Sequence, residues 1–464
     1  MSTIGQWRLR AAFAERLSRM YGQEVPAYAT LVDVSREVNE DVLRARGADA
    51  ERLGSIHRVT AERHGAIRVG TPDELRQVAR IFAALGRHPV GFYDLREAAA
   101  SAVPVVSTAF RPVDGAELAR NPFRVFTSML TPADPRFFDA DLRTRLEAFL
   151  ADRELFPPEL LAPADRAAAE RELPAEQAER FLQLAVAAFE LSPEPVDRAW
   201  YGTLERISAV AADIGGVRST HINHLTPRAL DIDELYRRMT ERGIEMIDTI
   251  QGPPAWKGPD VLLRQTSFRA LAEPRAMRTP DGSVVGGALR VRFGEVEARG
   301  IALTREGRAL YDELLGRVDE QASQNPAEAR SDIARAVWER HMPGSEEELA
   351  AEGLACFTYS PGTGRPGAGR PPTDLEGLVR EGWVRAEPIV YEDFLPRSAA
   401  GIFQSNLSGE GTRDDDRQGT AYDAARLSGA IGREVLDPFD LYAHQQNRSL
   451  AHVARALGLS ATPG

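Results

Sequence analysis

One pattern occurs twice in the chain, as HGAIRVGTPDEL in residues 64–75 and as HLTPRALDIDEL in residues 224–235. The two segments align without a gap, and both have a histidine first, an arginine four residues later and Asp-Glu-Leu at the end. A short apolar run before Thr-Pro-Asp-Glu or Asp-Ile-Asp-Glu is typical of a strand that leads into a capped helix. We therefore predict two related modules, each beginning with a strand and a helix.

The sequence around the two copies supplies further expected strands. After the first copy they are VGFYDL (90–95) and VPVVSTAFRPV (103–113). After the second they are VLLRQTSFRAL (261–271) and ALRVRFGEVEARGIAL (288–303), with TPDGSVVGG (279–287) as a hairpin turn between them.

The remaining chain is expected to be mainly helical, apart from a Gly/Pro-rich loop, SPGTGRPGAGRPPTD, at residues 360–374. We predict five segments along the 464 residues. They are a helical segment (1–60), a first module (61–133), a helical insertion (134–215), a second module carrying metal ligands (216–320), and C-terminal helices with a substrate-contacting loop (321–464).

Composition excludes several classes of function. The formal net charge of −12 argues against a nucleic-acid-binding surface, which needs clustered basic residues. No run approaches the roughly 18 apolar residues of a membrane-spanning helix. The single cysteine, Cys356, cannot form an intrachain disulfide, so we expect a reducing, cytoplasmic compartment. Neither nucleic acid nor a membrane is expected as a partner, and the oligomeric state is left open.

The repeat singles out two of the eight histidines. A lone histidine is usually a structural residue, but His64 and His224 hold equivalent positions, and two modules paired about a pseudo-twofold axis would bring them to one centre. Residues four apart on a strand share a face, so Arg68 points the same way as His64. His221 points the other way from His224, and we interpret it as a core hydrogen-bonding residue.

A carboxylate would complete a two-histidine, one-carboxylate site, the arrangement of mononuclear iron(II) oxygenases with open coordination positions. The segment RFGEVEARG (292–300) offers Glu295 and Glu297 on one face of a strand. The alternative interpretation, a solvated strand with charges of both signs, suits Glu297 and Arg299 better than Glu295.

Four motifs resemble the 2-oxoadipate dioxygenase/decarboxylase family of the vicinal oxygen chelate superfamily. They are HINHLTPRALDID (221–233), LLRQTSF (262–268), RFGEVEARGIALT (292–304) and FLPRSAAGIFQSNL (394–407). The resemblance extends over about residues 60 to 410 and implies an α+β fold, with paired βαβββ modules around one metal and added helical layers. It also selects Glu295 over Glu297 as the ligand, because relatives carry the ligating glutamate two residues after a phenylalanine.

The resemblance further implies the activity. The protein is expected to be an iron(II) dioxygenase that converts 2-oxoadipate and O2 to 2-hydroxyglutarate and CO2, in lysine degradation. Arg68 is the best candidate for the distal carboxylate of this substrate, since a guanidinium can bind a carboxylate through two hydrogen bonds. A structural ion pair is its alternative role.

The family also implies substrate contacts from the backbone around Arg397 and Ser398. The residue before Ser398 is usually small and apolar in that family, whereas this chain has Arg397. Two other functions stay open at this point: a metal-dependent lyase or isomerase of the same superfamily, and a non-catalytic protein that binds small molecules.

Overall fold

A five-stranded sheet contains the first strand of both copies of the repeat. The computed structural model describes residues 2–47, 63–97, 102–362, 370–406 and 413–463. The strands follow the order β3-β4-β5-β2-β8. They are β2 (His64–Val69), β3 (His88–Asp94), β4 (Val105–Arg111), β5 (Arg124–Leu130) and β8 (His224–Thr226). β2 runs parallel to β5 and antiparallel to β8.

The first module follows the expected order of strand, helix and three strands. Helix α4 (Pro72–Ala84) begins in a capping box, in which Thr71 and Glu74 each bind the other's backbone amide. Its apolar face, including Leu75, Val78 and Phe82, is buried. Every residue of β2, β4 and β5 is buried as well, so this sheet forms the centre of the molecule.

The second module repeats this connectivity. After β8 come α11 (Ile232–Glu241), β9 (Leu263–Ser267) and β12 (Glu295–Arg299), and β9 pairs with β12 antiparallel. Arg228 forms a parallel bridge with Glu297 of β12. In the first module, β2 likewise pairs in parallel with β5. Antiparallel bridges from Met246 to Phe268 and from Gln251 to Gln265 supply the missing neighbour of β9.

The antiparallel pair β2–β8 joins the two modules. Gly65 lies opposite Leu225, which is its own equivalent in the repeat. A pseudo-twofold axis therefore passes between these residues, with His64 and His224 one step away on either side. The sequence-based prediction of paired βαβββ modules is confirmed.

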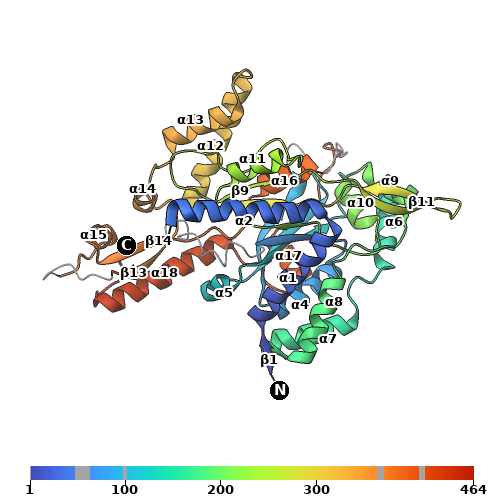
Figure 1. The fold of residues 1–464 in the computed structure, drawn as a ribbon, viewed down its shortest axis with the longest axis horizontal. Helices are drawn as coiled ribbons and strands as arrows, with labels where there is room; N and C mark the ends of the chain where they lie inside the picture. Colours follow the sequence, from blue (N-terminus) through green and yellow to red (C-terminus); the bar gives the residue numbers. More distant parts are fainter. Residues whose placement is uncertain (1, 48–62, 98–101, 363–369, 407–412, 464) are drawn as a thin grey trace.

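Helices cover this core on several sides (Figure 1). Tyr21 of α1 (Gln6–Glu24) donates to the backbone oxygens of Asn223 and Phe293. Asn39 of α2 (Pro26–Arg46) exchanges hydrogen bonds with the backbone of Arg228 and Leu230. The expected N-terminal helices thus fix the strand that follows His224.

Residues 134–215 contain five helices and two very short strands. These elements are α6 (Ala140–Ala151), α7 (Pro158–Glu170), β6 (Glu172–Pro174), α8 (Ala175–Ala187), β7 (Val196–Asp197), α9 (Arg198–Glu205) and α10 (Ala209–Gly215). β6 pairs with β1 (Thr3–Gly5), which connects this segment to the N-terminus. The short helices η2 (Leu95–Glu97) and α5 (Gly115–Arg120) lie within the first module.

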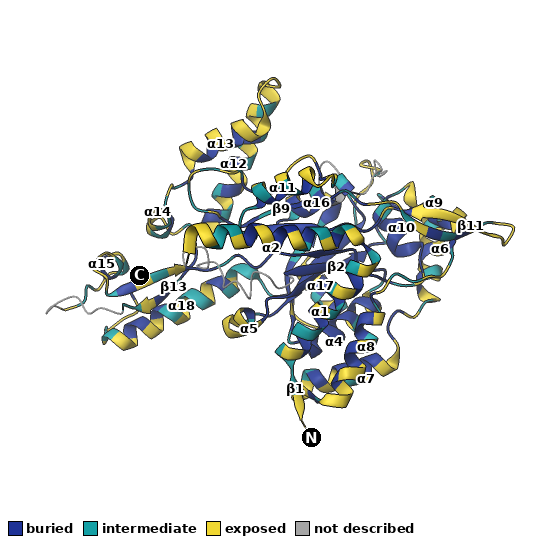
Figure 2. Ribbon diagram, viewed as in Figure 1, coloured by how far each residue is buried: buried dark blue, intermediate teal, exposed yellow. Residues whose placement is uncertain are grey.

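Much of the C-terminal part lies on the outside of the molecule, and one of its helices, α16 (Pro396–Asn406), returns to the core (Figure 1). Its other elements are α12 (Arg305–Gln324), α13 (Arg330–His341), α14 (Glu346–Ala351), β13 (Phe357–Pro361), α15 (Leu375–Arg380), β14 (Val384–Pro388), α17 (Ala424–Ile431) and α18 (Pro438–Leu457). The outer faces of α12, α13 and α18 are exposed, whereas the strands at the centre are buried (Figure 2). Of the expected loop 360–374, residues 363–369 lie outside the described residues.

The predicted hairpin turn at TPDGSVVGG was wrong in its extent. The hairpin joins β10 (Glu273–Arg278) to β11 (Val284–Leu289), so the turn is Thr279–Ser283 and VVGG belongs to a strand. Ladder pairing with β10 keeps Gly286 and Gly287 extended despite their weak strand preference. Among the described helices, none is long and apolar enough to cross a membrane.

Candidate metal centre

Three buried side chains from three strands meet near the pseudo-twofold axis. His64 of β2, His224 of β8 and Glu295 of β12 each offer a ligand atom, and these atoms lie within 4.8 Å of one another. The two imidazole centroids are 5.4 Å apart. Glu295 Oε1 lies 3.2 Å from His64 Nε2, and Glu295 Oε2 lies 3.5 Å from His224 Nε2.

Within the described part of the chain, several ligand atoms of this group lack a hydrogen-bond partner, whereas His64 Nε2 lies 3.0 Å from Thr226 Oγ1. Among the described residues, neither ring nitrogen of His224 has a hydrogen-bond partner, nor does Glu295 Oε1. Buried polar atoms are nearly always hydrogen-bonded, so three such atoms at one point indicate a missing partner. Two imidazoles and a carboxylate are a donor set that suits a divalent transition metal, and the residues fit such an ion.

Burial shifts the pKa of two members of this group, whereas for His64 the effect of burial is outweighed by the nearby Glu297 and Glu295, which raise its pKa. The pKa of His224 lies well below its ordinary value, because burial and the nearby His64 and Arg68 disfavour the imidazolium. Burial raises the pKa of Glu295, against the attraction of His64. A neutral imidazole is the form that binds a metal, so His224 is ready for ligation without losing a proton.

Glu297 holds the second nitrogen of His64. Its Oε2 lies 2.8 Å from His64 Nδ1, and Arg299 donates to both of its oxygens at 2.5 and 2.8 Å. Arg63 adds a contact of 3.3 Å. Burial opposes the charge of Glu297, but Arg299 and His64 outweigh it and hold the pKa of this carboxyl well below its ordinary value.

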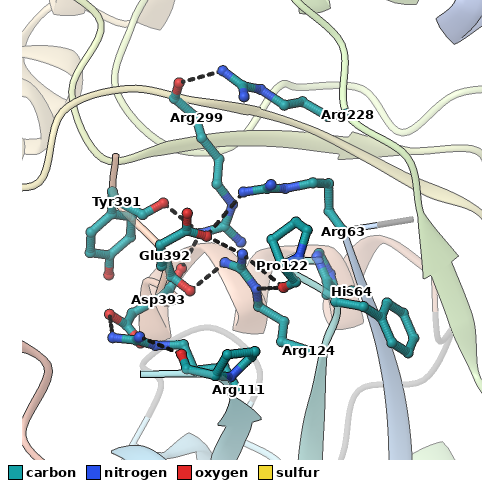
Figure 3. Close-up of polar contacts among 12 residues, drawn as sticks. Arg63, His64, Arg111, Pro122, Arg124, Arg228, Arg299, Tyr391, Glu392 and Asp393 are labelled. Carbon is teal, nitrogen blue, oxygen red and sulfur yellow. Dashed lines mark hydrogen bonds and ion pairs between the residues drawn. The ribbon is translucent and has the colours of Figure 1, made fainter. Parts of the chain in front are cut away.

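A segment distant in sequence reaches the same arginines (Figure 3). Glu392 forms ion pairs with Arg63 and Arg124, and Asp393 binds Arg111 with distances of 2.7 and 2.9 Å. The backbone oxygens of Tyr391 and Asp393 accept from Arg299. The segment 391–393 is therefore fixed against β4, β5, β12 and the residue before β2, which surround the candidate metal centre. Phe394, directly after it, packs edge-on against His64 at a centroid distance of 4.9 Å.

A small cavity of about 10 Å³ opens next to the cluster, enough for roughly one water molecule. Its lining consists of His64, Phe126, His224, Gln265, Glu295, Phe394, Ala399 and Ile402. 2-Oxoadipate, the substrate expected from the sequence, needs more room than this. Its binding here would require displacement of lining side chains. Ala399 and Ile402 belong to α16, whose Asn406 donates to Ser267 Oγ of β9 at 2.7 Å.

Arg68 lies on the strand of His64 and is buried. Its guanidinium donates to Asp213 Oδ2 at 2.5 Å, and the same oxygen accepts from Asn223 at 2.9 Å. Nε2 of His221 lies 3.3 Å from Asp213 Oδ1 and 3.1 Å from the Asn223 amide. His221 thus takes part in a buried polar cluster, outside the three-residue group that could hold a metal.

The two expected substrate residues of α16 point differently. The side chain of Arg397 is exposed and pairs with Asp319 of α12 at 2.5 Å, whereas Ser398 is buried beside Ala399. Sequence reasoning did not place Gln265, Asp213 or Phe126 at the site. A signal for Gln265 exists, since strand pairing puts it directly opposite Glu297.

Comparisons with known proteins agree on one family. The sequence profile of the 2-oxoadipate dioxygenase/decarboxylase family matches residues 13–406. The 2-oxoadipate dioxygenase/decarboxylase of Mycobacterium tuberculosis is 59% identical over 435 residues, covering 94% of this chain and 95% of the relative. That of Pseudomonas putida is 42% identical over 467 residues, with 97% of each chain covered.

A solved structure extends the similarity to three dimensions. The crystal structure of the P. putida hydroxyglutarate synthase in complex with 2-oxoadipate superposes with a TM-score of 0.84 at 39% identity. The match covers 99% of this chain and 100% of the other.

Proposed function

Because the chain belongs to the 2-oxoadipate dioxygenase/decarboxylase family, we propose that it converts 2-oxoadipate and O2 to 2-hydroxyglutarate and CO2. The observation that carries the proposal is the buried group of His64, His224 and Glu295, which has ligand atoms without partners. The expected iron(II), lysine-degradation and cytoplasmic assignments, and the division of the chain into five segments, belong to the same proposal.

The reaction balances without a second reductant. 2-Oxoadipate loses its 1-carboxyl group as CO2, which supplies two electrons, and one C–H bond of the shortened acid becomes C–OH, which supplies two more. These four electrons reduce O2, whose atoms end in the new carboxylate and the new hydroxyl group. No separate oxidisable cosubstrate is therefore needed.

Different residues of the chain would have different roles in this reaction. His64, His224 and Glu295 would hold iron(II), which when bound supplies the centre where the 2-oxo acid chelates and oxygen reacts. Glu297 holds His64 Nδ1, so that Nε2 faces the metal position. The apolar side chains of Phe126, Phe394 and Ile402 line this position and would restrict the access of water to it.

Arg68 would bind the distal carboxylate. Two facts support this role: it lies on the strand that carries His64, and it is 4% exposed, where an ion pair is strong. Asp213 accepts a hydrogen bond from the guanidinium, and Asn223 donates to the same oxygen of Asp213 and so holds this carboxylate in place. The structural ion pair with Asp213 and the binding of substrate are compatible, since a guanidinium has five N–H donors.

The backbone amides of Arg397 and Ser398 are further candidates for substrate contact. They belong to the first turn of α16, where amides precede the first intrahelical hydrogen bond, from Ala399 to Leu395. Such amides favour anions. Since the Arg397 side chain pairs with Asp319, its departure from the family pattern does not place a charge in the cavity.

The test is oxygen uptake by protein loaded with iron(II) under anaerobic conditions and then mixed with a series of 2-oxo acids. We expect 2-oxoadipate to give equal amounts of consumed O2 and released CO2, with 2-hydroxyglutarate as product. Product formation without O2 would favour the lyase or isomerase alternative. Binding of 2-oxoadipate without any turnover, in protein with full iron content, would favour the non-catalytic alternative.

A further inference from the structure

Gln265 has a buried side-chain amide at the candidate metal centre, and none of the roles described so far involves it. It lies in the middle of β9, directly opposite Glu297 of β12, and is 2% exposed. Directly opposite residues of an antiparallel pair lie on one face, so Gln265 shares its face with the two glutamates of β12. Its side chain lines the cavity beside His64 and Glu295.

The amide of Gln265 is not satisfied by the protein. Its Oε1 has no hydrogen-bond partner in the part of the chain that the structure describes, and a half-turn of the amide about its last side-chain bond puts the two N–H donors in the same place. Apart from the metal ligands, its neighbours around the cavity are apolar: Phe126, Phe394, Ala399 and Ile402. A leucine would fill this place without the free energy that an unpaired buried amide costs. The arrangement therefore indicates a partner that arrives with a ligand.

A structural role does not explain why the amide of Gln265 is unpaired. The nearby polar group of β9 that fixes α16 is Ser267, whose hydroxyl accepts from Asn406. Thr266, between the two, faces the opposite side of the strand. The backbone of Gln265 already pairs with Gln251, so β9 keeps its position without the side chain.

We propose that Gln265 is a substrate-binding residue whose side-chain amide donates a hydrogen bond to the 1-carboxylate of the bound 2-oxo acid. In the proposed function the 1-carboxylate would lie at the metal position, whereas Arg68 would bind the far end. This inference rests on the proposed function. It assigns the two ends of the substrate to different side chains, one neutral at the metal and one charged at the distal carboxylate.

The two assignments can be separated by substrate binding without turnover. Protein loaded with Co(II) is titrated anaerobically with 2-oxoadipate and with 2-oxohexanoate, which lacks the distal carboxylate, and affinity is measured by calorimetry. Gln265→Leu should weaken binding of both acids by a similar factor, roughly 10- to 100-fold, as for a hydrogen bond to a charged group. Thr266→Val, on the other face of the same strand, is the matched control and should change neither affinity. Co(II) content should equal that of the wild type in both variants.

Each other outcome has a definite meaning. Unchanged affinity of Gln265→Leu for both acids overturns the inference, and a loss confined to 2-oxoadipate moves Gln265 to the distal end and overturns it too. Gln265→Met, equally long and apolar, replaces Gln265→Leu if that variant does not fold. Failure of both to fold would show that the amide stabilises the fold. If the Co(II)-loaded wild type binds neither acid, the proposed function fails instead.

Discussion

Glu297 connects His64, a proposed metal ligand, to the arginines behind it, and its substitution should have separate effects on metal binding and on stability. The carboxylate is fully buried and contacts His64, Arg299 and Arg63. Glu297→Ala leaves Arg299 without its two short hydrogen bonds and frees Nδ1 of His64. Glu297→Gln keeps the shape and one acceptor but removes the charge.

The two substitutions differ in expected magnitude. Removing one partner of a buried ion pair costs about 3–5 kcal/mol, so Glu297→Ala should lose a large part of the typical 5–15 kcal/mol of folding free energy. Loss of a carboxylate that orients a ligating histidine typically weakens metal binding by about 10- to 100-fold. At roughly 1.4 kcal/mol per factor of ten, Glu297→Gln should lose about 1.4–2.8 kcal/mol of metal-binding free energy.

Two measurements check these values. Urea unfolding of the metal-free proteins gives the stability, and competition with a chromophoric chelator gives the Co(II) affinity. Glu273→Gln is the control, because Glu273 pairs with Arg292 at 2.5 Å and is outside the metal cluster. It should leave the Co(II) affinity unchanged.

Wild-type Co(II) affinity in Glu297→Gln would refute the reasoning. The orientation of His64 would then be set by the pairing of β2, by its edge-on contact with Phe394 and by its contact with the Thr226 hydroxyl.

Four further outcomes are expected. Arg68→Ala should retain iron yet lose about tenfold or more in kcat/KM for 2-oxoadipate, with far less change for 2-oxohexanoate; equal losses would contradict a distal contact. Arg68→Lys should recover only part of this loss. His224→Ala should abolish iron retention, measured by elemental analysis, whereas His221→Ala should keep some; the reverse would mean that the wrong histidine is assigned. Burial raises the pKa of Cys356 to about 12, so a thiol reagent at pH 8 should label it only after unfolding, and rapid labelling of native protein would contradict the structure.

The sequence predicted the parts of this molecule that depend on local pattern and duplication. The aligned segments at His64 and His224 were enough to expect two modules about a pseudo-twofold axis, since equivalent residues must face each other across such an axis. The capped helix at Thr71 and the strand at Val105 follow from short-range rules.

What the sequence did not reveal depends on contacts between distant segments. Nothing near Glu392 or Asp393 indicates that they bind arginines of the first module, because such pairing is set by tertiary packing. The partner of Arg68, Asp213, lies in a helical segment with no special pattern. The family resemblance selected Glu295 as the ligand, but the role of Glu297 needed the structure. A solvated strand position suited Glu297 in the sequence, whereas the residue is buried against His64 Nδ1 and Arg299.

The pairing of equivalent strands in the two modules bears on how many protein ligands a metal ion would have at this site. Arg68 and Arg228 are repeat equivalents; Arg68 lies beside Ser128 on β5, and Arg228 beside Glu297 on β12. Two residues before Ser128 lies Phe126, and two residues before Glu297 lies Glu295. Phe126 therefore has in the first module the position that the proposed ligand Glu295 has in the second. A carboxylate at position 126 would give a bound ion a fourth protein ligand, but this chain has an aromatic ring there, at the cavity wall. This asymmetry between the halves would leave one side of a bound ion open to small molecules.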